Sequence, residues 1–199
     1  MERYRRYLAD RLSPGRLAHS LGVMRVMEEL AAVYALELAP ARTAGLLHDA
    51  ARDLSRDQLI ELAERAGIPL DGLAHRQPLY LHGPVGAHLV AVELGVPDRL
   101  VLESIATHSF HRDGPLFDHP FCWCVRFADL LAPSHPWVGL HKLGAAVRAG
   151  RAAEAALLHC RWLRQYLQER GVPLHPVLEH ADRRRLEGQE LPDDFFERW

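Results

Sequence analysis

The sequence lacks long apolar runs and has few cysteines. Nowhere do about eighteen apolar residues follow one another, so no membrane span is expected. The charged N-terminus, residues 1–7, leads into no apolar segment or cleavage site of the kind that secretion signals have, which favours a cytoplasmic protein. An odd number of cysteines in such a protein predicts reduced thiols, and we expect Cys122, Cys124 and Cys160 to pack in the core.

The chain also lacks a strong charge of either sign. Its formal net charge is -2, so no overall positive field is available to hold nucleic acid non-specifically. We therefore expect no nucleic-acid partner and a small-molecule substrate instead. With 48% apolar and 25% charged residues, the composition is typical of a folded protein with one substantial core.

Alternating apolar and polar runs bounded by turn pairs, which would indicate strands, are absent as well. Helix signals are frequent: Ser13 and Pro14 form a helix start, and Ser55 with Gln58 forms a capping box. We predict an all-α fold, with one domain over residues 1–185 and a short tail over 186–199. One expected helix begins at Pro14, a second runs from about Pro40 to Asp49, and a third starts after Ser55 and ends at Gly67. Further helices are expected over 85–94, 99–107, 121–131 and about 151–170.

Histidine is the residue that the chain has in excess, with thirteen copies. His48 and Asp49 end an apolar helical segment, where adjacent side chains lie about 100° apart around the axis and could serve two metal ions. The carboxylate of Asp49 has two oxygens, so it could bridge a pair of cations. The pair alone is weak evidence, because a histidine at a helix end can also satisfy carbonyl groups or pair with the acid.

Four other residues strengthen the metal-site interpretation because they follow in a plausible order along the chain. His19 lies on an earlier helix, His82 precedes a helix, His108 ends one, and Asp129 is the acidic residue of an apolar run. Four imidazoles and two carboxylates suit iron, manganese or cobalt better than a structural zinc site.

Two of these assignments have competitors. His111 lies three residues after His108 and would share its helix face if that helix continued, and His88 competes weakly with His82. For the set as a whole, scattered helix-end and core histidines are the alternative explanation.

Several blocks of sequence around these residues resemble a known family. The blocks are RLAHSLGV at 16–23, AGLLHDAARDL at 44–54, LHGPVGA at 81–87, IATH at 105–108, FAD at 127–129 and GVPLHP at 171–176. From about Ser13 to Arg183 the chain resembles the HD-domain symmetrical bis(5'-nucleosyl)-tetraphosphatases of bacteria, the YqeK type.

The resemblance implies an HD-domain helical bundle that cleaves diadenosine tetraphosphate into two ADP by attack of a metal-activated hydroxide. It also implies two metal ions, with iron expected first and manganese or cobalt as alternatives. The ligands that it implies are His19, His48, Asp49, His82, His108 and Asp129.

Other residues are assigned from position alone. We expect Asp49 and Asp53, which lie one helical turn apart, to act with Arg52 in catalysis, Asp53 orienting a ligand or moving a proton. Arg16 and Arg52 are expected to hold the polyphosphate. Surface ion pairs are the alternative explanation for both arginines.

The chain departs from the family pattern in three places. Arg52 stands where the family usually has lysine, which keeps the charge but changes the geometry. Residues 109–114 replace a short turn that contains threonine and glycine, and residues 130–135 lack an expected phosphate-binding arginine. His111 or His135 could contact phosphate in place of the missing groups.

Three functional hypotheses follow from these observations. The first is the symmetrical tetraphosphatase, which the extent of the matching blocks favours. The second is an HD-domain phosphohydrolase for another nucleotide, which the altered 109–114 segment favours. The third is a catalytically quiet nucleotide-binding or scaffold protein, which the complete ligand set disfavours. A homodimer is also possible under each hypothesis.

Overall fold

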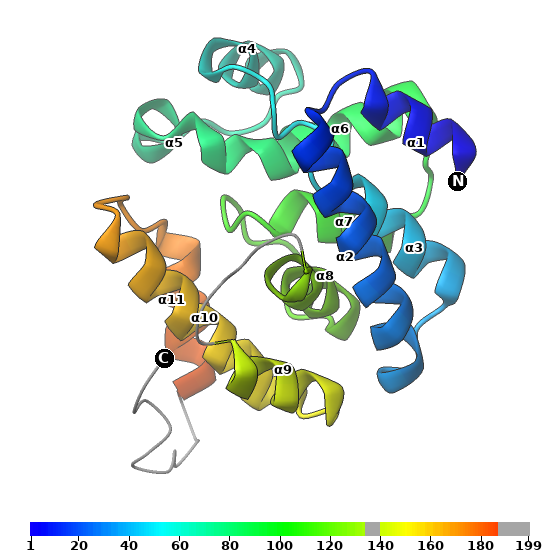
Figure 1. Cartoon of the computed structure of the whole chain (residues 1–199). Coiled ribbons are helices and arrows are strands. Elements are labelled where there is room, and N and C mark those ends of the chain that lie inside the picture. The colour runs from blue at the N-terminus through cyan, green and yellow to red at the C-terminus, as the bar shows by residue number, and fades with distance from the viewer. Residues whose placement is uncertain (134–139, 187–199) are drawn as a thin grey trace.

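A computed structural model describes residues 1–133 and 140–186 of the chain, with the backbone alone for 182–186 (Figure 1). These residues contain α-helices, one 3-10 helix (η1) and no strand, so the all-α prediction is confirmed. None of the helices described is both long enough and apolar enough to cross a membrane. In chain order the elements are α1 Glu2–Ala9, α2 Pro14–Val33, α3 Leu38–Leu47, α4 Arg56–Arg65, α5 Gly72–Arg76, η1 Pro78–Leu81, α6 His82–Leu94, α7 Arg99–Thr107, α8 Pro120–Leu131, α9 His141–Arg148, α10 Ala152–Glu169 and α11 Pro176–Leu186.

Local capping signals place most helix starts where the sequence predicts them. Before α4, the Ser55 hydroxyl accepts from the Gln58 amide at 3.2 Å and the Gln58 side chain accepts from the Ser55 amide at 2.9 Å, which confirms the capping box. Helix α2 begins at Pro14 as expected, but the hydroxyl of Ser13 makes no capping bond. Its amide instead donates to Asp53 Oδ2 at 2.7 Å, which ties the start of α2 to the segment after α3.

Some elements differ from the sequence prediction. Helix α3 ends at Leu47, so His48 and Asp49 lie in the turn that follows it rather than in the helix. Helices α1, α5, α9 and α11 were not expected; α1, α5 and α9 are eight residues or shorter, too few for an apolar period to be recognised. Helix α6 begins at His82, three residues before the expected start at 85, so His82 is its first residue and does not precede it. Helix α7 ends at Thr107 as expected, just before His108.

The packing places α8 at the centre of the fold. Figure 1 shows α2, α3 and α7 on one side of α8 and the α9 to α11 group on the other. Helix α2 packs against α3 and α8, and it buries Met24, Met27, Leu30 and Ala31 along one face. A smaller apolar cluster joins α4, α5, η1 and α6. The three cysteines are buried thiols, in agreement with the prediction: Cys122, Cys124 and Cys160.

Two glycines allow the helices that carry the candidate ligands to approach closely. A Cβ at Gly45 would lie 2.9 Å from Met24 Cα, so only glycine lets α3 pass so near α2. A Cβ at Gly83 would lie 2.4 Å from Ser109 Oγ and 3.0 Å from the Ile105 carbonyl oxygen, where α6 meets the end of α7. The first approach brings His48 towards α2, and the second brings the start of α6 to the end of α7.

Candidate metal centre

Three of the candidate ligands share one backbone arrangement that fixes how their rings point. Each imidazole Nδ1 bonds to the carbonyl oxygen of the residue three positions earlier, and because a carbonyl can only accept, Nδ1 carries the proton. The Nε2 atoms of all three rings therefore face away from these carbonyls, towards a common centre. The bonds are His48 to Gly45 at 2.9 Å, His82 to Leu79 at 2.5 Å and His108 to Ile105 at 2.7 Å.

The Nε2 atoms have few protein partners of their own. His48 Nε2 is buried without a hydrogen bond. His82 Nε2 and His108 Nε2 lie 3.0 Å from each other. With Nδ1 protonated in both rings, these two nitrogens would face each other as lone pairs unless a proton or a cation lies between them. The arrangement therefore fits a bound cation.

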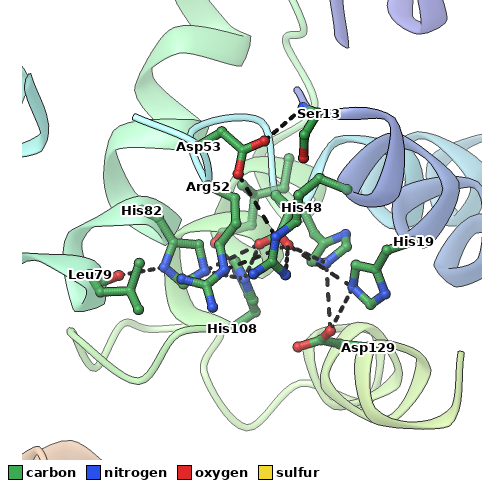
Figure 2. Close-up of polar contacts among 12 residues, drawn as sticks. Ser13, His19, His48, Arg52, Asp53, Leu79, His82, His108 and Asp129 are labelled. Atoms are coloured by element: carbon green, nitrogen blue, oxygen red, sulfur yellow. Dashed lines mark hydrogen bonds and ion pairs between the residues drawn. The ribbon is translucent and has the colours of Figure 1, made fainter. Parts of the chain in front are cut away.

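Two carboxylates complete the cluster (Figure 2). Asp49 Oδ1 lies 3.3 Å from His82 Nε2 and 3.6 Å from His108 Nε2. Its other oxygen, Oδ2, lies 3.7 Å from His48 Nε2 and 4.0 Å from His19 Nε2. Asp129 Oδ1 lies 2.9 Å from His19 Nε2 and 3.7 Å from His48 Nε2. Asp49 thus directs one oxygen to each pair of histidines.

The structure accordingly brings together all of the residues that the sequence nominates as ligands. Among the residues described, sets of three donor atoms within 4.8 Å of one another could each hold a metal ion. The sets are His19, His48 and Asp49; His48, His108 and Asp129; and Asp49, His82 and His108. Nitrogen and oxygen donors of this kind suit borderline and hard divalent cations.

Burial and mutual charge shift the pKa values of the cluster strongly. Burial raises the pKa of Asp49 and of Asp129, but the adjacent histidines outweigh it and hold both values well below the usual range. Burial opposes protonation of His48, yet the Asp49 and Asp129 carboxylates raise its pKa to about 9. Burial lowers the pKa of His82 to about 4. Both carboxylates are therefore ionised, and His82 is neutral, at neutral pH.

Two arginines lie at the open side of the cluster. Arg16 Nη1 and Arg52 Nε each lie 3.9 Å from Asp49 Oδ2, and their side chains are 31% and 22% exposed. Asp53 lies behind Arg16, with Oδ1 3.8 Å from Arg16 Nε and Oδ2 bonded to the Ser13 amide. Among the contacts described, none joins Asp53 to a cluster histidine. It contacts the site through Arg16 and the start of α2.

Comparison with known proteins agrees with this geometry. The family model described as HD domain matches residues 16–158, which is more than half of the chain. The chain belongs to the HD-domain family. Members of this family are hydrolases that bind divalent metal ions, so this HD domain is a metal-binding phosphohydrolase.

Three relatives are similar over most of their length. The symmetrical bis(5'-nucleosyl)-tetraphosphatase of Bacillus subtilis is 29% identical over 67% of this chain and 70% of its own. The protein of the same name from Halalkalibacterium halodurans is 28% identical over 66% of this chain and 68% of its own. A similar crystal structure is that of a Clostridium acetobutylicum protein described as a predicted HD superfamily hydrolase involved in NAD metabolism. The two proteins are 27% identical in sequence, and their structures align with a TM-score of 0.86 over 94% of this chain and 97% of the other.

The other candidate histidines that the structure of the HD domain describes lie outside the donor sets. Helix α7 ends at Thr107, and Phe110 has a φ of 58°, a left-handed conformation that is rare for an aromatic residue and that turns the chain out of the helical path. His111 therefore does not share the helix face of His108, and its Nε2 donates to the Pro69 carbonyl at 3.1 Å. His88 lies in α6 outside the sets of donor atoms. His135 falls outside the residues that the structure describes.

Sequence reasoning missed the groups that orient the ligands. The carbonyls of Gly45, Leu79 and Ile105 fix the imidazole rings, yet every residue type has a carbonyl, so these positions carry no signal in the sequence. The role of Gly45 in the close packing of α2 and α3 is also invisible, because a lone glycine in a helix has many explanations.

Proposed function

We propose that this HD domain cleaves diadenosine tetraphosphate symmetrically into two ADP, with two divalent metal ions, of which iron is expected. The observation that carries the proposal is the position of Asp49 between two pairs of histidines, with one oxygen towards each pair. Relatives that bear the name of this activity support the choice of substrate. Manganese or cobalt would suit the same donors.

The residues divide naturally between two ions. His19, His48, Asp129 and Asp49 Oδ2 would hold the first, and His82, His108 and Asp49 Oδ1 would hold the second. Such ions, when bound, lower the pKa of water and neutralise charge on phosphoryl oxygens. The protein holds Asp49 and Asp129 ionised and His82 neutral for this purpose, so those three offer unprotonated donor atoms at neutral pH.

The arginines complete the electrostatic part of the mechanism. Symmetrical hydrolysis adds the oxygen of water to one of the two central phosphorus atoms and breaks the bridge between the second and third phosphates, which releases two ADP. Arg16 and Arg52 are partly exposed beside Asp49, so their guanidinium groups can bind phosphate oxygens and the departing negative charge. Asp53 orients Arg16 and anchors α2, which carries His19.

Metal content and reaction products test the proposal together. Elemental analysis of the purified chain is expected to give about two metal ions, as a two-metal site requires, and incubation with diadenosine tetraphosphate is expected to give ADP as the sole product. His48→Ala should lose both. His88→Ala, which changes a histidine of α6 outside the donor sets, is the matched control and should keep both. A wild-type chain with metal but no cleavage would refute the substrate assignment.

A second candidate is hydrolysis of another nucleotide, and one observation favours it. The basic residues of the substituted 109–114 segment already have protein partners: Arg112 pairs with the buried Glu103 at 2.9 Å, and His111 bonds to Pro69. In this conformation the segment supplies no obvious phosphate contact. Activity on a panel of dinucleoside polyphosphates and mononucleotides distinguishes the candidates, because a preference for a mononucleotide such as ATP would replace the first proposal.

The role of Asp53 has its own test. If Asp53 acts by orienting Arg16, then Asp53→Asn and Arg16→Ala should each raise KM, and the double variant should cost little more than either alone. A role in moving a proton would instead lower kcat in Asp53→Asn even when Arg16 is absent. Steady-state kinetics of the four proteins in this cycle distinguish the two roles.

A further inference from the structure

Arg126 is a charged residue in the interior of the fold. It lies on α8 and is 1% exposed. Three aromatic rings surround its guanidinium, with Cζ 5.1 Å from the ring centroid of Phe110, 4.0 Å from that of Phe117 and 4.6 Å from that of Trp123. Such contacts stabilise a buried guanidinium, but they do not by themselves explain why a charged residue occupies this position in the core.

The hydrogen bonds of Arg126 reach two other segments. Nη2 donates to the Thr107 hydroxyl at 2.9 Å and to the Thr107 carbonyl at 3.2 Å. Nη1 donates to the Phe117 carbonyl at 2.9 Å. Thr107 is the last residue of α7, and its carbonyl also accepts from the Phe110 amide at 3.2 Å, so the guanidinium is a second donor to the carbonyl at this helix end. One side chain thus ties α8 to the end of α7 and to the segment that follows.

Two of the candidate ligands lie next to the positions that Arg126 joins. His108 directly follows Thr107, and Asp129 follows Arg126 by three residues, about one turn of α8. Donor atoms of His108 and Asp129 lie within 4.8 Å of each other in one of the sets that could hold a metal ion. Any movement of α7 relative to α8 would change this separation, and the Arg126 bonds oppose that movement.

We propose that Arg126 is a positioning residue that holds His108 and Asp129 at the separation that metal binding requires. The inference rests on the proposed metal centre. Groups that orient metal ligands from outside the coordination sphere change metal affinity by about 10- to 100-fold when they are removed, and we expect a loss of this size for Arg126.

A purely structural role would produce a different result. An apolar side chain of similar length, as in Arg126→Met, fills the space among the three rings and removes the donors. If Arg126 served only to fill the core, metal affinity would follow thermal stability. If it positions the ligands, metal affinity should fall by more than the change in stability explains.

The test compares variants that disturb the same region in different ways. Arg126→Met removes the hydrogen bonds, Arg126→Lys keeps the charge with a geometry that cannot span all three acceptors, and Phe117→Leu removes a ring but leaves its carbonyl in place. For each full-length protein, the melting temperature without metal and the Mn²⁺ affinity in competition with a chromogenic chelator are measured. We expect the affinity to fall most in Arg126→Met, less in Arg126→Lys, and to stay near wild type in Phe117→Leu.

If Arg126→Met does not fold, a smaller change at Thr107 tests the same contact between α7 and α8. Thr107→Val removes the hydroxyl that Arg126 contacts while keeping the side-chain volume, and Thr107→Ser keeps the hydroxyl. The serine variant should bind Mn²⁺ more tightly than the valine variant at equal melting temperature. Equal affinities in this pair, or losses in Arg126→Met and Phe117→Leu that match their losses in melting temperature, would overturn the inference.

Failure of the proposed function is seen separately. A wild-type chain that binds no divalent metal would refute the metal centre and the inference with it, before any variant is compared. A wild-type chain that binds metal but cleaves another nucleotide would leave the inference intact, because its readout is metal affinity.

Discussion

His82 and His108 place their Nε2 atoms 3.0 Å apart, although each ring donates its Nδ1 proton to a backbone carbonyl. Two neutral imidazoles in this arrangement repel each other, and a cation that binds both removes the repulsion. Metal binding should therefore stabilise the fold itself, since a ligand that binds only the native state adds a free energy that grows with the logarithm of its concentration relative to the dissociation constant.

The first prediction concerns this stabilisation. Adding Mn²⁺ or Fe²⁺ to the metal-free protein is expected to raise the melting temperature, by an amount equivalent to about 2.7 kcal/mol for each ion bound at a hundredfold excess over its dissociation constant. Differential scanning fluorimetry measures the shift. His82→Ala should lose the part of the shift that the second ion contributes, whereas His88→Ala should retain the whole shift, so an equal shift in both variants would contradict the role of His82.

The second prediction follows from the pKa of His48, which the neighbouring carboxylates raise to about 9 in the metal-free chain. A metal ion on Nε2 must displace this proton, so apparent metal affinity should rise with pH from about 6.5 to 9 and then level off. Calorimetry in two buffers with different ionisation enthalpies should show release of about one proton at pH 7. Identical heats in the two buffers would exclude the displacement.

The same shift has a defined effect on stability. The folded pKa of His48 lies above the unfolded value, so its protonation stabilises the metal-free fold fully below about pH 6.5, and that contribution is lost as the pH rises through 9. Asp49 and Asp129 act in the opposite sense, because their lowered pKa values stabilise the fold above about pH 4 and the contribution is lost in acid.

The third prediction concerns His159, which lies on α10 and is buried among aromatic rings. Burial, assisted by the Arg126 guanidinium, lowers its pKa to about 3. Below about pH 6.5 His159 is protonated in the unfolded chain but stays neutral in the folded chain. The free energy of unfolding should therefore fall by about 1.4 kcal/mol for each pH unit of acidification. Urea unfolding of the metal-free protein between pH 6.5 and 4.5 measures the slope.

Replacement of the ring separates this contribution from others that act in acid. His82 has a similarly lowered pKa and contributes in the same direction, so the wild-type slope contains both. His159→Leu should therefore reduce the slope by about 1.4 kcal/mol per pH unit without abolishing it. A slope unchanged by this substitution would show that His159 is protonated in the folded chain.

The fourth prediction concerns the approach of α2 to α3. In Gly45→Ala the new Cβ would lie 2.9 Å from Met24 Cα and 3.0 Å from Met27 Cγ, so the helices must separate. We expect a loss of about 1 to 3 kcal/mol in the free energy of unfolding, as for other overpacked cores, together with weaker metal binding as His19 moves away from His48.

Gly15→Ala is the matched control for Gly45→Ala. A Cβ at Gly15 meets no atom within 4 Å, and the position lies in the first turn of α2. This substitution should be neutral or slightly stabilising, because alanine favours the helix over glycine by up to about 1 kcal/mol. Comparable losses in both variants would mean that close helix packing is not what Gly45 provides.

Much of the fold follows from local patterns in the sequence. The capping box at Ser55 and Gln58, the proline at the start of α2 and the glycine that closes α6 act within a few residues of each other, so the corresponding helix ends are confirmed. Helices α1, α5 and α9 were missed because each spans eight residues or fewer, too few for an apolar period to be recognised, and α11 was missed because its segment is polar and begins at a proline. The boundary at residue 185, the homodimer and the cytoplasmic location stay predictions.

The sequence by itself determined the kind of chemistry: the order of His19, His48, Asp49, His82, His108 and Asp129 nominated the cluster that the structure brings together. Only the tertiary structure decided how the side chains are used. It divided the two oxygens of Asp49 between two histidine pairs, turned His111 away at Phe110, and joined Arg126 to the end of α7. Residue type fixes which atoms can bind a cation, whereas the distances between them depend on contacts between helices far apart in the chain.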